Sequence, residues 1–225
     1  MTQQAHTALF TYPIKAAFGR ILPKAKIYEY GAVGARLKGL FTEQVEQITW
    51  QYKLGPETIN LPASPGVPEI QVFGMQLRTP ELHKDVLSCI DKAIPFPILF
   101  ELHFDSRIQV AACYKRPSEA EADHWVCSNY FATDWVPAET PRTTMPIALQ
   151  MAGLYEQFLH QLAALSARPL EPLGDFVERA SKRQAVQCEM ERVALRLEKE
   201  KQFNRKVEIN AQLRQMTDDF EALSK

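Results

Sequence analysis

Apolar and polar residues alternate with a period of two along much of the chain, and this pattern predicts a β-sheet. In EQITWQYKL the apolar side chains fall on one face, as they do in a strand with one buried side. Comparable runs, with a hairpin turn at Asp105–Ser106, raise the predicted number of strands to five. The predicted strands cover residues 46–54, 69–77, 97–104, 107–115 and 124–135.

A spacing of three and four between apolar residues predicts helices around these strands. Pro13 suits the first turn of a helix reaching Arg20, and Thr79 suits the N-cap of a helix reaching Ala93. Further helices are predicted at residues 24–30, 42–46 and 147–167. The order of elements indicates an α+β fold, with a mostly antiparallel five-stranded sheet and flanking helices.

The last fifty residues have a different pattern, with apolar residues at heptad spacing between many charges. The two apolar seams are out of phase, which is compatible with one long helix or with a helical hairpin. We favour the hairpin because each half then buries its seam without a partner. The sequence thus predicts a sheet domain over 1–170 and a hairpin or coiled-coil arm over 171–225. The seam residues are Val186, Met190, Val193, Leu197, Ile209, Leu213, Met216 and Phe220.

Composition is that of a soluble globular protein, with 46% apolar and 24% charged residues. No apolar run is long enough to span a membrane, and the polar start argues against a signal peptide. Four cysteines without CxxC spacing indicate reduced thiols, so we expect a cytoplasmic protein.

The net charge of -1 conceals an asymmetry along the chain. Residues 1–40 contain six basic side chains and one acid, whereas residues 41–175 contain nine bases and seventeen acids. Aromatic residues are interleaved with the N-terminal bases, and this arrangement can bind phosphates and stack on bases. The candidate residues of this segment for nucleic-acid or partner binding are Lys15, Arg20, Lys24, Lys26, Arg36 and Lys38.

A long loop at residues 55–68 separates the first two predicted strands, and loops of this length are often functional. Lys53 precedes this loop and Asn60 lies within it. We therefore add Lys53 and Asn60 to the candidate residues for partner or nucleic-acid binding.

No catalytic constellation is evident. Glu101, His103 and Asp105 alternate on one predicted strand, and we interpret them as a solvated sheet face. A divergent metal-dependent nuclease would need an Asp followed by an acid-x-Lys on the next strand. The nearest candidates are Asp85 or Asp91 followed by Glu101-Leu102-His103, which lacks the lysine, as does Glu69-Ile70-Gln71. Histidines and cysteines do not cluster at zinc spacings, and no nucleotide-binding glycine motif is present. We therefore predict no catalytic residue, metal or cofactor.

The segments WQYKLGPETINLP and PEIQVFGMQL, followed by PFPILFELHF and the charged tail, resemble domain-of-unknown-function family 4391. The most specific stretch runs from Trp50 to Leu61, and the resemblance extends from about Ile21 into the tail. Members of that family are often encoded beside helicases and DNA methyltransferases of restriction-type, phage-defence loci. The resemblance implies a partner class and carries over no catalytic residue.

These observations lead to a primary hypothesis and two alternatives. The primary hypothesis is a non-enzymatic adaptor subunit of a DNA restriction or phage-defence complex, bound to a helicase or DNA methyltransferase and possibly to DNA. Homodimerisation through the C-terminal helices is compatible with it. The alternatives are a DNA-binding module that uses the basic N-terminal segment and a divergent metal-dependent nuclease.

Overall fold

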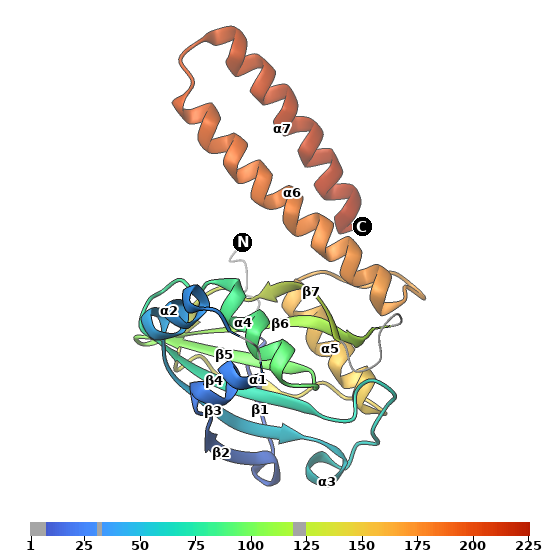
Figure 1. Cartoon of the computed structure of the whole chain (residues 1–225). Helices are drawn as coiled ribbons and strands as arrows, with labels where there is room; N and C mark the ends of the chain where they lie inside the picture. Colours follow the sequence, from blue (N-terminus) through green and yellow to red (C-terminus); the bar gives the residue numbers. More distant parts are fainter. Residues whose placement is uncertain (1–7, 31–32, 119–124) are drawn as a thin grey trace. The chain divides into compact units, whose positions relative to one another are not determined.

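The computed structural model describes residues 8–30, 33–118 and 125–225 (Figure 1). The chain divides into two compact units, Met1–Ala164 and Leu165–Lys225, where the sequence predicted a division after residue 170. His124, the first residue of a predicted strand, lies outside the described residues. In the described part of the chain, no helix is both long and apolar enough to cross a membrane.

The first unit is built on a mixed, mostly antiparallel sheet of seven strands among the described residues. Its main path runs in the order β2-β3-β4-β5-β6-β7, and the short strand β8 pairs with β6. The pair β4–β5 is parallel and the other pairs are antiparallel. The strands are β2 (Ala17–Ile21), β3 (Val45–Leu54), β4 (Ile70–Leu77), β5 (Ile98–Phe104), β6 (Arg107–Pro117), β7 (Trp125–Ala132) and β8 (Val136–Pro137).

The prediction of five strands was wrong because the sequence did not reveal β2 and β8. Residues 17–21, predicted as the end of a helix, form an edge strand after the short 3-10 turn η1 (Ile14–Ala16). Gly19 adopts φ +64°, which a helix does not accommodate. Pairing with β3 and contact between Phe18 and Trp50 outweigh the helix signal of Pro13. Strand β8 is only two residues long, too short for an alternating pattern.

Three helices cover one face of the sheet: α1 (Lys24–Tyr30), α2 (Ala35–Gln44) and α4 (Lys84–Ala93) (Figure 1). Helix α4 is the crossover between β4 and β5, which makes that pair parallel. His83, and not Thr79, caps α4, because its Nδ1 accepts a hydrogen bond from the Asp85 N–H. The core on this face includes Ile27, Phe41, Ile48, Phe73, Met75, Val86, Ile90, Phe100 and Leu102.

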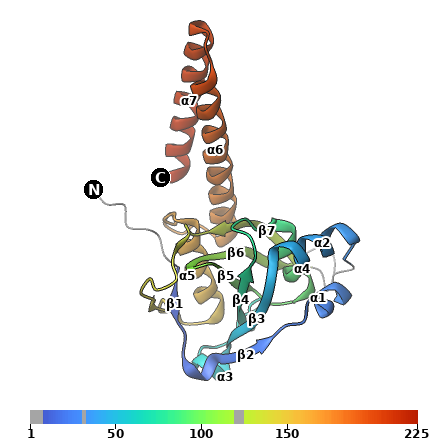
Figure 2. The same ribbon diagram turned by 90° about the vertical axis from the view of Figure 1, so that its left-hand side faces the viewer.

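The opposite face of the sheet is covered by α5 (Met151–Ala163), as the rotated view shows (Figure 2). Leu154, Phe158 and Leu159 are buried there. A parallel two-stranded ribbon of β1 (Phe10–Thr11) and β9 (Thr143–Thr144) also lies on this side, since the rings of Phe10 and Phe158 are 4.8 Å apart. The short helix α3 (Pro56–Ile59) occupies the loop after β3.

The hairpin of β5 and β6 shows why both faces need a covering layer. Phe100 pairs with Ala111, and Leu102 pairs with Gln109. The apolar residues Ile108 and Val110 of β6 therefore face the α5 side, opposite to Phe100 and Leu102 of β5. Both faces are apolar, and a sheet of this kind is stable only between two layers.

A chain of aromatic contacts crosses the sheet from β2 to β7. Its ring-centroid distances are 4.1 Å for Phe18–Trp50, 6.1 Å for Trp50–Phe73, 6.3 Å for Phe73–Phe100 and 6.4 Å for Phe100–Tyr130. Such neighbouring rings stabilise adjacent strands beyond the area that they bury. Strands far apart in the sequence are held in register by this row.

The second unit contains two long antiparallel helices, α6 (Leu173–Lys199) and α7 (Phe203–Ser224) (Figure 1). Residues 200–202 connect them. Arg196 donates a hydrogen bond to Gln212 at 2.8 Å, and Arg183 donates one to Ser224 at 3.0 Å. Of the two arrangements compatible with the sequence, the structure has the two helices rather than one.

An ion pair connects the start of this second unit to the hairpin. Arg179 makes two hydrogen bonds of 2.7 Å to the Glu171 carboxylate and also donates to the carbonyls of Ser166 and Leu223. The side chains of Arg179 and Glu171 are 6% and 8% exposed. The hydrogen bonds from Arg179 lower the pKa of Glu171 to about 2. The Arg179 guanidinium thus links α6 to Ser166, to Glu171 and to the end of α7 at Leu223.

Candidate functional site

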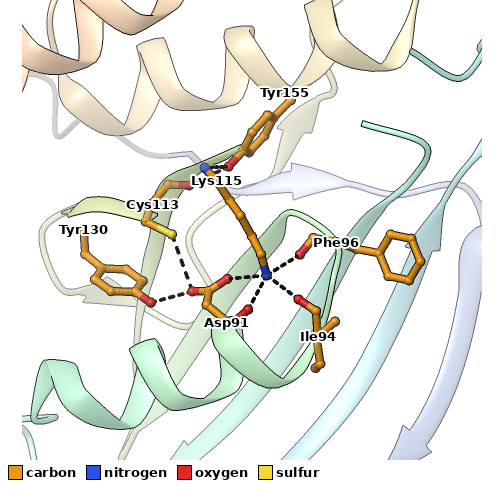
Figure 3. Close-up of polar contacts among 7 residues, drawn as sticks. All are labelled: Asp91, Ile94, Phe96, Cys113, Lys115, Tyr130 and Tyr155. Atoms are coloured by element: carbon orange, nitrogen blue, oxygen red, sulfur yellow. Dashed lines mark hydrogen bonds and ion pairs between the residues drawn. The ribbon is translucent and has the colours of Figure 1, made fainter. Parts of the chain in front are cut away.

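A fully buried polar group of the sheet unit is centred on Lys115 of β6 (Figure 3). Its side chain is 0% exposed, and its ammonium donates hydrogen bonds to the carbonyls of Asp91, Ile94 and Phe96. The carbonyls of Asp91 and Ile94 lie at the C-terminal end of α4, where helix carbonyls lack internal partners. Lys115 therefore caps α4 from the neighbouring sheet.

Asp91 compensates the buried charge of Lys115. Its Oδ1 lies 3.6 Å from Lys115 Nζ, and its Oδ2 accepts hydrogen bonds from the Tyr130 hydroxyl and, at 3.5 Å, from the Cys113 thiol. Burial raises the pKa of the Asp91 carboxyl, whereas Lys115 and the hydrogen bonds lower it. Burial and the neighbouring Asp91 raise the pKa of Tyr130. The opposite charges of Lys115 and Asp91 therefore compensate each other inside the protein.

Tyr155 of α5 reaches the same strand from the other face of the sheet (Figure 3). Its hydroxyl donates to the Cys113 carbonyl at 2.6 Å and accepts from the Lys115 N–H at 2.9 Å. The register between β6 and β7 shifts between Cys113 and Lys115, so this hydroxyl pairs backbone groups at an irregular point of the ladder. Tyr155 thus links α5 to the strand that carries Lys115.

Asp91, Cys113 and Cys127 form the single group of three metal-type ligands found among the described residues, with ligand atoms within 4.8 Å of one another. The zinc spacings considered in the sequence did not reveal this group, because its members come from α4, β6 and β7. The Lys115 ammonium already supplies a positive charge beside Asp91 and has no lone pair to offer a metal. The donor set therefore fits a buried ion pair better than a divalent cation.

Glu101 lies on the opposite face of the sheet, so our interpretation of a solvated face was wrong for this residue. It is 0% exposed and forms a bidentate ion pair with Arg142 at 2.7 and 2.8 Å. Arg142 also donates to the Phe10 carbonyl, which joins β1 to the sheet. Burial lowers the pKa of His103, which lies on the same side of β5 as Glu101.

The carboxylates considered for a nuclease do not converge. Asp91 packs on the helix-covered face with Lys115, whereas Glu101 pairs with Arg142 on the other face. Glu69 forms an ion pair with Lys53 of the neighbouring strand, with 3.2 Å between the Lys53 ammonium and the Glu69 carboxylate. The same ammonium lies 2.8 Å from the Glu57 carboxylate. Asp91, Glu101 and Glu69 thus lie in three separate environments.

The loop after β3 is held by local hydrogen bonds. The Thr58 hydroxyl donates to the Lys53 carbonyl at 2.7 Å and accepts from the Gly55 N–H at 2.9 Å. Asn60 is exposed, with φ 54°, and its N–H donates to the Pro56 carbonyl. Hydrogen bonds to Glu57 and Glu69 raise the pKa of Lys53. Lys53 is thus engaged within the chain, whereas Asn60 is available at the surface.

Residues 10–219 match the family described as a domain of unknown function, DUF4391. The chain belongs to this family. No curated protein and no solved structure matches the chain. The family resemblance seen in the sequence is thereby confirmed over nearly the whole length.

The basic N-terminal residues of this DUF4391 member are spread over several elements. Lys24 is half-buried, and its ammonium donates to the carbonyls of Phe41 and Val45. Arg36 lies 3.6 Å from Asp85, and Lys38 lies over the Tyr28 ring at 5.7 Å. The remaining members of the set, Lys15, Arg20 and Lys26, are exposed on η1, β2 and α1.

Edge strand β2 carries the exposed part of this basic segment. Phe18 is 40% exposed, its ring contacts the Trp50 ring at a tilt, and the Arg20 guanidinium carbon lies 5.0 Å from the Phe18 ring centre. Ile14 and Ile21 are exposed at either side, at 93% and 60%. An aromatic ring between a cation and an apolar edge is a surface on which an unpaired base can stack.

The hairpin of this family member covers its seams only in part. Val193 and Ile209 are buried, whereas the other predicted seam residues are half-buried. Next to the turn, Leu195, Phe203 and Val207 are more than half exposed, and we call these three the distal apolar residues. At the other end, an open groove of about 550 Å³ lies between the helices, with Lys182 and Asp219 among its lining residues.

Proposed function

We propose that this DUF4391 member is a non-enzymatic adaptor subunit of a DNA restriction or phage-defence complex, and that its helical hairpin binds the partner protein. The exposure of the distal apolar residues Leu195, Phe203 and Val207 carries the proposal. Apolar side chains left exposed in this number are typical of interaction surfaces. The family resemblance supplies the partner class, a helicase or DNA methyltransferase encoded in the same locus.

Two properties of the hairpin support binding to another protein. Its distal apolar residues are exposed by 55%, 78% and 53%, and the groove at the opposite end is lined mainly by Ala185, Val186, Ala222 and Leu223. Charged residues surround both regions, as in the polar rim of a protein interface. A partner with an apolar helical face would cover the distal apolar residues as a third or fourth helix.

Co-expression with the neighbouring helicase or methyltransferase tests this proposal. We expect the wild-type chain to retain the partner on affinity capture, and the variant L195D/V207D to lose it at least tenfold. The matched control I147D/L149D replaces residues of the sheet unit that are 92% and 90% exposed, and it should bind normally. Equal capture of the partner by L195D/V207D and I147D/L149D would refute the role of the hairpin. Analytical ultracentrifugation of the chain alone shows whether the distal apolar residues also mediate self-association.

DNA binding through β2 is the second candidate, supported by the exposed Phe18 and its contacts with Arg20 and Trp50. We expect a single-stranded oligonucleotide to bind the full chain with an affinity that falls as salt rises. Fluorescence anisotropy should show at least fivefold weaker binding for K15E/R20E, whereas K206E, an exposed change on α7, should match wild type. Binding that is absent at low salt, or unaffected by K15E/R20E, would reject this candidate.

A further inference from the structure

Two cysteines of adjacent strands lie side by side next to the Lys115 group. Cys113 of β6 is buried and Cys127 of β7 is half-buried. Their sulfur atoms and an Asp91 carboxylate oxygen all lie within 4.8 Å of one another. The other two thiols lie elsewhere, Cys89 buried in α4 and Cys188 exposed on α6.

We propose that Cys113 and Cys127 form a redox-active dithiol that closes to an intramolecular disulfide when the protein meets a peroxide. The pair lies at the irregular point of the β6–β7 ladder, where Cys113 is opposite Tyr130 and Cys127 is opposite Lys115. A change of side-chain rotamer at the half-buried Cys127 can bring the sulfur atoms into bonding distance. The two strands are already hydrogen-bonded neighbours, and Cys127 lies one pair further along the ladder than Cys113, so closure requires only a local approach of β6 and β7.

Cys113 and Cys127 differ in the pKa of their thiols and in their exposure. The neighbouring Cys113 thiol lowers the pKa of Cys127, whereas the Cys127 thiol, burial and Asp91 raise the pKa of Cys113. Cys127 is also the more exposed thiol, so a small oxidant reaches it first. Cys127 is therefore the nucleophile, and Cys113 is the resolving thiol.

The reaction balances with hydrogen peroxide as the oxidant. The Cys127 thiolate attacks one peroxide oxygen and the O–O bond breaks, which gives the sulfenic acid of Cys127. The departing hydroxide takes up the proton that Cys127 released and leaves as water. The sulfur of Cys113 then displaces the hydroxyl group, and the Cys113 proton leaves with it as water. Two thiols are oxidised to one disulfide, and one peroxide is reduced to two molecules of water.

Zinc binding is the competing use of these thiols. Tetrahedral zinc needs four ligands or three with an open position, and Asp91 Oδ2 already accepts hydrogen bonds from Tyr130 and Cys113. The Lys115 ammonium lies 3.6 Å from the other carboxylate oxygen and holds three carbonyls. A positive charge fixed at this position favours a thiolate and opposes a dication.

Peroxide treatment of the full chain, followed by intact-mass and thiol analysis, tests the proposal. We expect wild type to fall from four free thiols to two, to lose 2 Da, and to recover with dithiothreitol. The C188S control should form the same disulfide. The C113S variant should instead retain a sulfenic acid at Cys127 that reacts with dimedone, and C127S should form no disulfide.

Thermal unfolding gives a second measurement, because a cross-link between β6 and β7 restricts the unfolded chain. The midpoint of the sheet unit should rise by about 5 °C on oxidation and return on reduction. Three results would overturn the proposal. The first is that Cys113 and Cys127 both remain free thiols at a peroxide concentration that oxidises Cys188. The second is that the thermal unfolding midpoint of the sheet unit is the same in the oxidised and the reduced chain. The third is that purified wild type contains one equivalent of zinc and C113S contains none.

Discussion

Replacing Lys115 by methionine is expected to lower the free energy of unfolding of the sheet unit by about 3–5 kcal/mol. The substitution keeps most of the volume but leaves the Asp91 carboxylate buried without its counter-charge. It also removes the donor of three carbonyls at the end of α4. Urea unfolding followed by tryptophan fluorescence measures the loss, since Trp125 lies beside Lys115.

Two further variants show whether the charge pair causes this loss. K26M removes an exposed lysine from α1 and should leave stability unchanged. D91N/K115M removes both charges and should cost less than the sum of the single changes, because no charge is then left buried alone. A stability for K115M within about 1 kcal/mol of wild type would contradict the importance of the pair.

Replacing Glu171 by glutamine is expected to destabilise the hairpin unit by about 3 kcal/mol at neutral pH. The change leaves Arg179, whose side chain is 6% exposed, without its bidentate carboxylate. Amide hydrogen exchange along α6 and α7 of the full chain reports the loss locally. The matched control E178Q breaks an exposed pair with Lys182 on the same helix and should leave exchange unchanged.

The same pair predicts a pH dependence of the hairpin. The pKa of Glu171 is about 2 in the folded chain, below its ordinary value of 4.5. A carboxyl whose folded pKa is lowered stabilises the fold above its unfolded pKa, and this stabilisation is lost as pH falls towards the folded pKa. The hairpin should therefore weaken between about pH 5 and pH 2 in wild type, and E171Q should lack this part of the transition. Parallel curves for the two proteins would exclude Glu171 as the titrating group.

Alternation of apolar residues was sufficient to predict the five longer strands of the sheet, because each is half-buried or lies under a helix. It could not reveal β2, which is exposed along its length and is held by pairing with β3. The seam pattern of residues 186–220 predicted helix but left one long helix and a hairpin both open. The number of helices and their antiparallel order depend on residues 200–202, which contain no strong helix-breaking residue.

The Lys115 group was missed because a lysine in a strand is ordinarily read as exposed. One signal was present in α4, where Asp91 follows Leu87 by four residues and therefore falls on the apolar stripe. A carboxylate on a buried stripe needs a buried counter-charge. Nothing in the local sequence of Arg142 indicates its pairing with Glu101, since 41 residues separate them.

The adaptor proposal depends on whether the partner covers the hairpin. Hydrogen–deuterium exchange of the full chain, with and without the co-expressed helicase or methyltransferase, measures this directly. We predict slower exchange in α6 and α7, strongest near the distal apolar residues Leu195, Phe203 and Val207, with little change in α1, α2 and α4. Protection confined to the sheet unit, with exchange in the hairpin unaltered, would contradict the proposal.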